Sequence, residues 1–311
     1  MGTRQKAMEG EWETFVNWAM AKENNILIND QPVFYRVEGE GQPVVLLHGF
    51  AEDGTVWENQ VEYLKTKFQL IIPDLPGSGK SIGSEQMAMG NVQVIGAPQA
   101  GDGWNGFGQQ WSMEYFAECM GGILDQENIT ETIMIGHSMG GYVTLAFADK
   151  YPNRLNAFGL FHSSAYADSE EKIAARRRGI EFIKEYGPVK FLEQSIPNLF
   201  SEEFKKKDPA TIQKILTRFT NFTAQSLVNY YEAMIRRPDR THVLKSFPRP
   251  IQFILGKYDT AVPFELGLQQ CYMPGLSYIH VLEHAAHMGM WEDPSLSNAF
   301  IENFLLHGKI G

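Results

Sequence analysis

Five short apolar runs, interrupted only by one glutamine in the last, constrain the fold of this chain more than any other feature. They occupy residues 44–47, 70–73, 132–136, 158–161 and 251–256. Apolar runs of this length are typical of strands that are buried on both faces of a sheet. Helical patterns separate most of them, which predicts an α/β fold: a mostly parallel, doubly wound sheet with helices on both sides. The clearest helical patterns lie at residues 112–124, 140–150 and 295–306.

Residues 163–246 contain no run of this kind, and their apolar positions recur at helical spacing. Asp168 and Glu171 have the spacing of a capping box, and Asp208 with Pro209 offers an N-cap followed by a proline at the first helical position. We therefore expect an all-helical cap, inserted between two strands and covering the carboxyl edge of the sheet. Some of its large apolar side chains are expected to line a substrate pocket: Phe182, Phe191, Phe200, Phe219, Phe222 and Tyr230.

The predicted core therefore comprises residues 24–162 and 247–311, preceded by an N-terminal extension at 1–23. A glycine-rich insert at residues 82–110 interrupts the core, with almost no periodicity. Such a run in a compact domain is commonly a lid or a surface insert. A mobile lid, a flexible surface insert and an oligomer contact all stay open; as a lid, the insert would use Trp104, Phe107 and Trp111 as apolar contacts.

Composition narrows the class of protein. There are 27 lysines and arginines against 37 aspartates and glutamates, a net charge of −10, which disfavours general binding to nucleic acid. The basic cluster at residues 176–178 is expected on a solvated helix face. No apolar run approaches the length of a membrane span, and Cys119 and Cys271 are the only cysteines. These features predict a cytoplasmic protein that binds neither membrane nor nucleic acid.

Two pentapeptides fit the pattern G-x-S-x-G, at residues 79–83 and 136–140, so the pattern alone cannot choose between Ser81 and Ser138. A nucleophile elbow needs a strand arriving, a sharp turn with the serine at its apex, and a helix leaving. Ser138 follows a buried apolar run and precedes a helical pattern, whereas Ser81 leads into the glycine-rich insert. We therefore predict Ser138 as the nucleophile.

A serine hydroxyl needs a base within hydrogen-bond reach, itself oriented by an acid. Asp259 follows the apolar run at 251–256, at the same sheet edge as Ser138, and His287 lies in a loop of small residues. The chain order serine, aspartate, histidine is the one associated with this architecture. The oxyanion of an acyl transfer also requires two aimed N–H groups, for which we predict the amides of Met139 and Phe50.

At these motifs the sequence resembles the α/β-hydrolase fold serine hydrolases that carry a helical cap. The matching segments are LLHGF, PDLPGSGKS, IGHSMGGYVTLAFADKYP, ILGKYDTAVP and HAAHMGMWEDP. The resemblance implies Ser138 as nucleophile, His287 as base, Asp259 as orienting acid, and Phe50 and Met139 as oxyanion donors. Serine at the elbow argues against epoxide hydrolases and haloalkane dehalogenases, which use aspartate there. The insert at 82–110 departs from the family pattern.

The predicted activity is hydrolysis of small, fairly apolar carboxylic esters. A lactonase, a thioesterase, a carbon–carbon hydrolase, or a non-catalytic ligand-binding or signalling member of the fold stays open. No cofactor or metal is expected: Lys80 lacks the glycine spacing of a phosphate loop, residues 101–106 lack the frame of a dinucleotide site, and His280, His284 and His287 lack a partner with zinc spacing. Acyl and alcohol preference and oligomeric state do not follow from the sequence.

Overall fold

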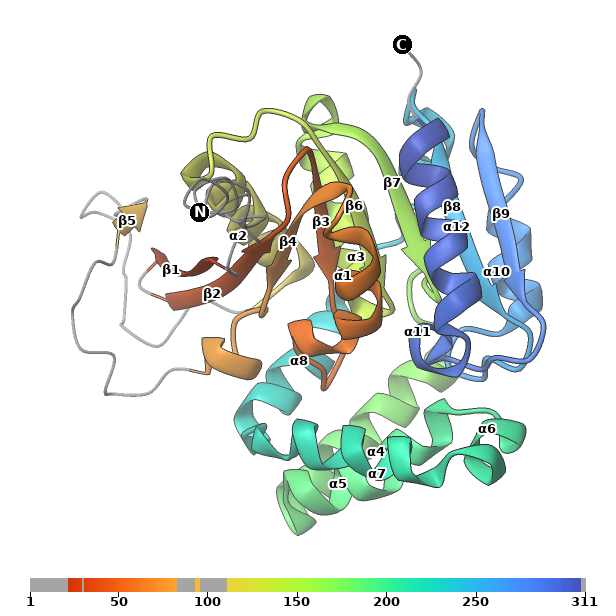
Figure 1. Ribbon diagram of the computed structural model, residues 1–311. Coiled ribbons are helices and arrows are strands. Elements are labelled where there is room, and N and C mark those ends of the chain that lie inside the picture. The colour runs from red at the N-terminus through yellow and green to blue at the C-terminus, as the bar shows by residue number, and fades with distance from the viewer. Residues whose placement is uncertain (1–21, 30, 83–92, 96–110, 309–311) are drawn as a thin grey trace, which may run out of the picture.

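The computed structural model describes residues 22–29, 31–82, 93–95 and 111–308 (Figure 1). Its centre is a sheet of nine strands in the order β5-β1-β2-β4-β3-β6-β7-β8-β9. Strand β2 is antiparallel to both β1 and β4, and all other neighbours are parallel. The strands are β1 Lys22–Ile28, β2 Gln31–Glu38, β3 Gln42–Leu47, β4 Phe68–Pro73, β5 Gln93–Ile95, β6 Thr132–His137, β7 Leu155–Phe161, β8 Ile251–Gly256 and β9 Ser277–Leu282.

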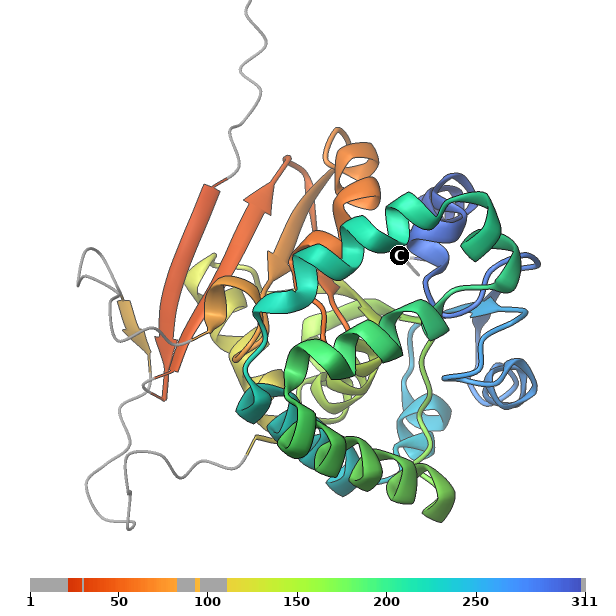
Figure 2. The same ribbon diagram turned by 90° about the horizontal axis from the view of Figure 1, so that it is seen from below.

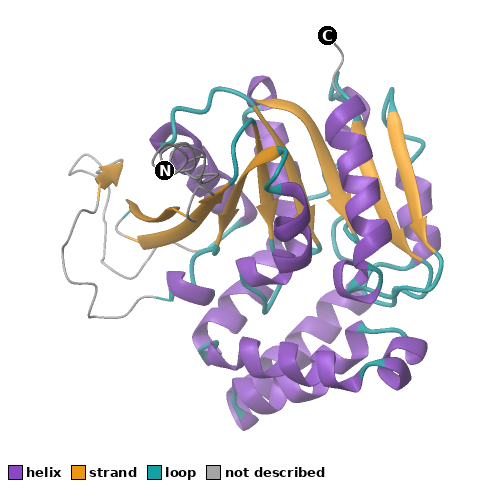
Figure 3. Ribbon diagram, in the orientation of Figure 1, coloured by secondary structure: helices purple, strands orange, loops and turns teal. Residues whose placement is uncertain are grey.

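Helices cover both faces of this sheet (Figure 3). Helices α1 and α12 lie on the face toward the viewer of Figure 1, and α2, α3 and α10 lie on the far face. The helices are α1 Glu58–Leu64, α2 Met113–Gln126, α3 Met139–Lys150, α4 Glu170–Tyr186, α5 Pro188–Ser195, α6 Glu202–Lys207, α7 Pro209–Arg218, α8 Ala224–Arg236, α9 Thr241–Ser246, α10 Phe264–Gln270, α11 Gly289–Glu292 and α12 Pro294–His307.

The five apolar runs are the strands β3, β4, β6, β7 and β8, and nearly all of their residues are buried. The prediction of a mostly parallel, doubly wound sheet is thus confirmed. Burial on both faces explains why these strands show no alternation of apolar and polar residues. β9, at the edge of the sheet, is only partly buried, which matches its mixed sequence.

The helices between β7 and β8 form a layer across one edge of the sheet (Figures 1 and 2). We call residues 170–236, which form α4 to α8, the helical segment; α9 instead contacts α3. Asp208 caps α7 as predicted, because its side chain accepts from the Thr211 amide. The capping box at Asp168 was wrong: Ser169 caps α4 by accepting from the Lys172 amide, one residue later than expected.

Several sequence predictions fall on residues outside the described part of the chain. These include most of residues 1–23, Trp104, Phe107 and most of the insert. Residues 93–95 of the insert add a short parallel strand beside β1, which its weak periodicity did not indicate. Trp111 is described, and its ring lies 5.1 Å from that of Tyr230. No helix among the described residues combines the length and the apolar character needed to cross a bilayer.

Candidate active site

Ser138 occupies the sharp turn between β6 and α3. Its backbone has φ 50° and ψ −114°, a combination that L-residues rarely adopt and that stores strain. The turn is held because the Ser138 amide donates to the Phe161 carbonyl at 3.0 Å and the Gly141 amide donates back to the Ser138 carbonyl at 3.0 Å. The strained turn lifts the serine off the strand and presents it to the cavity described below.

Glycines allow the strand and the helix to approach at this turn. A Cβ on Gly136 would lie 2.3 Å from the backbone of Gly140, and a Cβ on Gly140 would lie 2.5 Å from the Leu47 carbonyl oxygen. Both distances are far inside van der Waals contact, so neither position accepts a side chain. The pattern G-x-S-x-G is therefore a packing requirement here as well as a chemical one.

The structure brings Ser138, His287 and Asp259 together from three distant parts of the chain. Ser138 Oγ lies 2.9 Å from His287 Nε2, and His287 Nδ1 lies 2.8 Å from Asp259 Oδ2. Asp259 follows β8 and His287 follows β9, so both loops leave the same edge of the sheet as the serine turn. In this geometry the imidazole can accept the serine proton while its other nitrogen donates to the carboxylate.

Asp259 is prepared for this role by its surroundings. Its Oδ1 accepts from the amides of Ala261 and Val262, each at 2.8 Å. Burial alone would raise the pKa of Asp259, but the charge attraction of His287 and His162 and the hydrogen bond with His287 outweigh burial and lower it. The carboxylate is therefore ionised at neutral pH and aimed at Nδ1 of His287.

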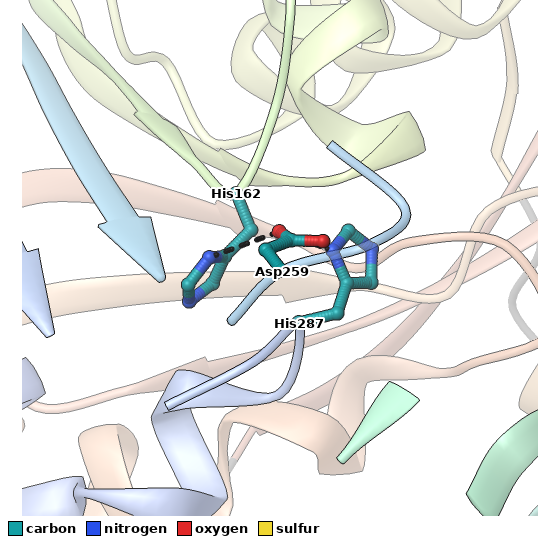
Figure 4. A group of neighbouring side chains, drawn as sticks. All are labelled: His162, Asp259 and His287. Carbon is teal, nitrogen blue, oxygen red and sulfur yellow. Dashed lines mark hydrogen bonds and ion pairs between the residues drawn. The ribbon is translucent and has the colours of Figure 1, made fainter. Parts of the chain in front are cut away.

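His162, at the end of β7, is a site residue that the sequence analysis missed. Figure 4 shows Asp259 between the imidazoles of His162 and His287. Nδ1 of His162 lies 3.3 Å from Asp259 Oδ2, but the two groups are not aligned for a hydrogen bond. Neither ring nitrogen of His162 has a hydrogen-bond partner among the described residues. Burial, partly offset by Asp259, lowers the pKa of His162 to about 4, so the ring is neutral near pH 7.

Two glycines make room for this third histidine. A Cβ on Gly256 would lie 2.7 Å from His162 Cε1, and one on Gly289 would lie 2.5 Å from His162 Nε2. His162, Asp259 and His287 also form a grouping with metal-ligand chemistry. His287, however, is engaged by Asp259 through Nδ1 and by Ser138 through Nε2, which suits proton transfer and not ligation.

A second buried carboxylate–imidazole pair stands behind the serine turn. Glu52 Oε2 lies 2.9 Å from His137 Nδ1 and accepts from the Gly49 amide at 2.6 Å, while His137 Nε2 lies 3.0 Å from the His287 carbonyl oxygen. Burial opposes both charges, yet the partners dominate: the pKa of Glu52 is lowered by His137, and the pKa of His137 is raised by Glu52. Both ring nitrogens of His137 face acceptor oxygens, a geometry that favours the doubly protonated imidazolium.

The loop after β3 lies against the serine turn and carries Phe50. A Cβ on Gly49 would lie 3.1 Å from Ser138 Cβ. The loop is fixed by buried His48, whose Nδ1 lies 2.8 Å from the Gly49 carbonyl oxygen and whose Nε2 accepts from the Leu75 amide at 2.9 Å. No described group accepts from the Phe50 amide. Met139 is the first residue of α3, where a helix leaves its amides without intrahelical acceptors.

The helical segment is bonded directly to the loop that carries His287. The His287 amide donates to the Leu199 carbonyl at 2.9 Å. The carboxylate of Glu292 accepts from the amides of Ser201 and Ala286, each at 2.9 Å, and so joins the two sides a second time. The position of His287 therefore depends on Leu199, a residue more than 80 positions earlier in the sequence.

A cavity of about 560 Å³ opens above Ser138, between the sheet edge and the helical segment. That volume suits a small organic molecule. Of the aromatic residues expected to line it, only Phe219 does. The helical segment also supplies Tyr231, Met234 and three aliphatic residues, and the loops at the sheet edge, α3 and α10 supply the other apolar lining residues. The basic cluster is also divided: Arg177 and Arg178 are exposed as predicted, but Arg176 turns inward and lines the cavity.

The residues that competed with these predictions have other roles. Ser81 is buried and fully used, since its Oγ accepts from the Phe34 amide and donates to the Asp74 carbonyl. His280 stacks on Phe300 with ring centroids 4.3 Å apart, and His284 is exposed near Glu203. The structure therefore does not gather His280 and His284 around His287.

The chain is similar in sequence and fold to known proteins. Residues 42–179 match the sequence model of a family described as alpha/beta hydrolase fold. A thermophilic esterase from Thermogutta terrifontis superposes with a TM-score of 0.80 at 28% identity, covering 93% of this chain and 100% of that one. The enol-lactonase from Burkholderia xenovorans LB400 superposes with a TM-score of 0.77 at 19% identity, covering 91% and 100%.

Curated relatives of similar length carry other names. A 2-hydroxy-6-oxononadienedioate/2-hydroxy-6-oxononatrienedioate hydrolase from Burkholderia vietnamiensis is 24% identical over 284 residues, 88% of this chain and 90% of that protein. A 2-hydroxy-6-oxo-6-phenylhexa-2,4-dienoate hydrolase from Comamonas testosteroni is 24% identical over 306 residues, 89% and 92% of the two chains.

Proposed function

We propose that the chain, which has the α/β-hydrolase fold, is a serine hydrolase that cleaves carboxylic esters through an acyl-enzyme on Ser138. The observation that carries this proposal is the chain of two contacts, Ser138 Oγ to His287 Nε2 at 2.9 Å and His287 Nδ1 to Asp259 Oδ2 at 2.8 Å, at the wall of the cavity. The likeness to the Thermogutta terrifontis esterase supports the choice of an ester bond.

In the first half of the reaction, Ser138 Oγ attacks the ester carbonyl carbon as its proton passes to His287 Nε2. The carbonyl π electrons move to oxygen, and the resulting oxyanion accepts from the amides of Phe50 and Met139. The tetrahedral intermediate then collapses: the carbon–oxygen bond to the alcohol breaks, and His287 returns its proton to the departing alkoxide. Ser138 is left acylated, and the free alcohol can leave.

In the second half, water takes the place of the alcohol. His287 removes one proton from the water as its oxygen attacks the acyl carbon, and the same two amides hold the new oxyanion. Collapse breaks the bond to Ser138 Oγ, which regains a proton from His287, and the carboxylic acid is released. Asp259 stays ionised throughout and stabilises the imidazolium each time it forms. The scheme uses no cofactor.

Hydrolysis of 4-nitrophenyl butyrate by the wild-type and Ser138→Ala proteins tests the proposal. We expect the variant to lose on the order of 10⁴- to 10⁶-fold in kcat while remaining folded. Ser81→Ala is the matched control for the other G-x-S-x-G serine, and its residual folded protein should keep the wild-type kcat. A fluorophosphonate probe should label wild-type protein at Ser138; absence of both labelling and turnover would instead indicate a ligand-binding member of the fold.

A carbon–carbon bond hydrolase is the second candidate, because curated relatives over most of the chain are named for that chemistry. The enol-lactonase among the solved structures adds a cyclic ester as a third substrate type. The three substrate types are distinguished by measuring kcat/KM for a 2-hydroxy-6-oxohexa-2,4-dienoate, for butyrate esters and for γ-lactones. The ester proposal fails if the dienoate is cleaved at a far higher kcat/KM than every ester tested.

A further inference from the structure

One wall of the cavity is built around a single buried carboxylate with three cations. Asp168 Oδ2 accepts from Arg176 Nε at 2.6 Å, and its Oδ1 lies 2.9 Å from Arg237 Nη2 and 4.0 Å from Lys172 Nζ. The Asp168 side chain is fully buried, and that of Arg176 is only 12% exposed. All four residues line the cavity that contains Ser138.

The charges on this wall do not balance. Glu52, the other carboxylate among the lining residues, forms a pair with the His137 imidazolium and contributes no net charge. Asp168 can neutralise only one of its three cations. The cavity wall therefore keeps a surplus of positive charge, and a low-dielectric cleft with such a surplus attracts anions.

Two of the three cations also keep unused hydrogen-bond donors. Arg237 is committed to the fold, since it donates to the carbonyls of Met234 and Tyr166 and lies 3.8 Å above the Tyr142 ring. Arg176, in contrast, has no acceptor for Nη1 among the described residues, and Lys172 Nζ donates to one carbonyl, that of Ala261 at 2.9 Å. An ammonium carries three N–H groups and a guanidinium five, so both retain donors for a ligand.

The three cations also act on Tyr142, which lies in the first turns of α3. Burial by itself raises a phenol pKa, as at Tyr231, where burial raises it to about 12. At Tyr142 burial also acts, but the charges of Arg237, Lys172 and Arg176 outweigh it and lower the pKa. The cationic wall thus reaches a side chain only four residues from the nucleophile.

Tyr231 lies between Arg176 and Phe50 in the cavity. The Arg176 guanidinium lies 5.6 Å from the Tyr231 ring centroid, and Tyr231 stacks on Phe50 with centroids 4.3 Å apart. Phe50 supplies one of the two proposed oxyanion donors. A molecule whose carbonyl oxygen sits at that amide can therefore extend along Tyr231 toward Arg176.

We propose that Arg176 and Lys172, oriented by Asp168, form a carboxylate-binding subsite, so that the preferred substrate is an ester carrying a carboxylate away from the scissile bond. The planar guanidinium presents paired N–H groups that match a carboxylate, and the ammonium adds a second donor. This inference deepens the proposed function and rests on it for the position of the ester.

Matched esters test the subsite. Mono-4-nitrophenyl glutarate carries a carboxylate on the acyl side, and its methyl ester is the neutral counterpart. The butyrate ester of 4-hydroxybenzoate and that of its methyl ester place the same difference on the alcohol side. For wild-type protein we expect a kcat/KM ratio of anionic to neutral ester of about 10 or more in one of the two pairs.

Variants then assign the preference to residues. Arg176→Gln should lower that ratio by about 10- to 100-fold, with Arg176→Lys and Lys172→Gln intermediate. Arg177→Gln is the matched control, because Arg177 is the exposed neighbour on the same helix and does not line the cavity. Each ratio is measured within one protein preparation, so a reduced folded fraction cancels.

A ratio near one in both wild-type pairs, or a ratio unchanged by Arg176→Gln, overturns the subsite while leaving ester hydrolysis intact. Loss of the preference in Arg177→Gln to the same extent overturns it as well. If no ester is cleaved, the proposed function fails, and the subsite is tested by calorimetry instead. Glutarate should then bind the wild-type protein and glutaramide should not, and equal or absent binding of the two rejects the subsite.

Discussion

The imidazole of His137 lies 3.0 Å through Nε2 from the backbone carbonyl oxygen of His287. The residue immediately before Ser138, the proposed nucleophile, therefore holds the loop that carries His287, the proposed base. Glu52 completes the arrangement, because it binds His137 and the Gly49 amide at once. One buried ion pair thus ties the serine turn, the Phe50 loop and the His287 loop to one another.

Glu52→Gln is expected to destabilise the protein strongly. The substitution keeps the shape of the side chain but leaves the buried His137 charge without its partner, a change that costs about 3–5 kcal/mol of unfolding free energy. Urea denaturation at pH 7 measures the loss. Glu62→Gln is the control: Glu62 is exposed and pairs only with Lys65 at the surface, so its substitution should change stability little. Equal effects of the two would contradict the buried-pair account.

The same pair predicts a decline of stability in alkali. Because Glu52 raises the pKa of His137 in the folded state, the contribution of His137 is complete below about pH 6.5, its usual unfolded pKa. It is lost as the pH rises through the raised folded value. In Glu52→Gln this alkaline decline should shrink. Urea midpoints between pH 6 and 10 give the comparison, and parallel curves for the two proteins would rule the linkage out.

His162 predicts a decline of stability in acid. Its folded pKa of about 4 lies below the ordinary value near 6.5, so its contribution is complete above pH 6.5 and is lost as the pH falls toward 4. The linked free energy is about 3 kcal/mol. His162→Gln should flatten the pH dependence of unfolding across this window. His284→Gln, at an exposed histidine, should leave the slope unchanged.

The positive φ of Ser138 predicts an inverted glycine effect. At an ordinary exposed helical position such as Ala174, replacement by glycine costs about 1 kcal/mol. At Ser138 the strained backbone penalises every residue with a Cβ, and glycine relieves it. Ser138→Gly should therefore be at least as stable as Ser138→Ala, although both lack the nucleophile. Calorimetric Tm values decide, and a Ser138→Gly protein less stable than the alanine variant would refute the strain.

Gly140→Ala should prevent the native packing of α3 on the serine turn. Its Cβ would lie 2.5 Å from a backbone oxygen that cannot move aside as a side chain does. Gly275→Ala is the control, because no atom lies within 4 Å of its Cβ position. We expect little folded protein for the first and normal yield for the second, as judged by circular dichroism and gel filtration. Normal folding of Gly140→Ala would show that the turn can open.

The sequence located residues of the candidate site where the signal is local. Ser138 is distinguished from Ser81 by the apolar strand before it and the helix after it, and the structure shows Ser81 occupied by Phe34 and Asp74. Asp259 and His287 follow from strand ends and chain order. In each case a few neighbouring residues carry the information, and the parallel topology brings the strand ends to one edge.

The sequence was insufficient where a contact joins distant segments. Asp168 looks like a helix cap, but Ser169 takes that role and leaves the carboxylate for Arg237, nearly 70 residues later. Arg176 is indistinguishable from Arg177 by composition; only the direction of the helix face separates them. His162 directly follows a buried strand and Glu52 lies in the loop after β3, and the partners of both are set by tertiary packing alone.

The hydrogen bond from the His287 amide to the Leu199 carbonyl makes the helical segment above the cavity part of the support of the proposed base. Deleting this segment would do more than open the cavity. The His287 amide would lose its acceptor, and the His287 imidazole would no longer be held in position. The rate of hydrogen exchange at the His287 amide would consequently report how often the helical segment separates from the His287 loop.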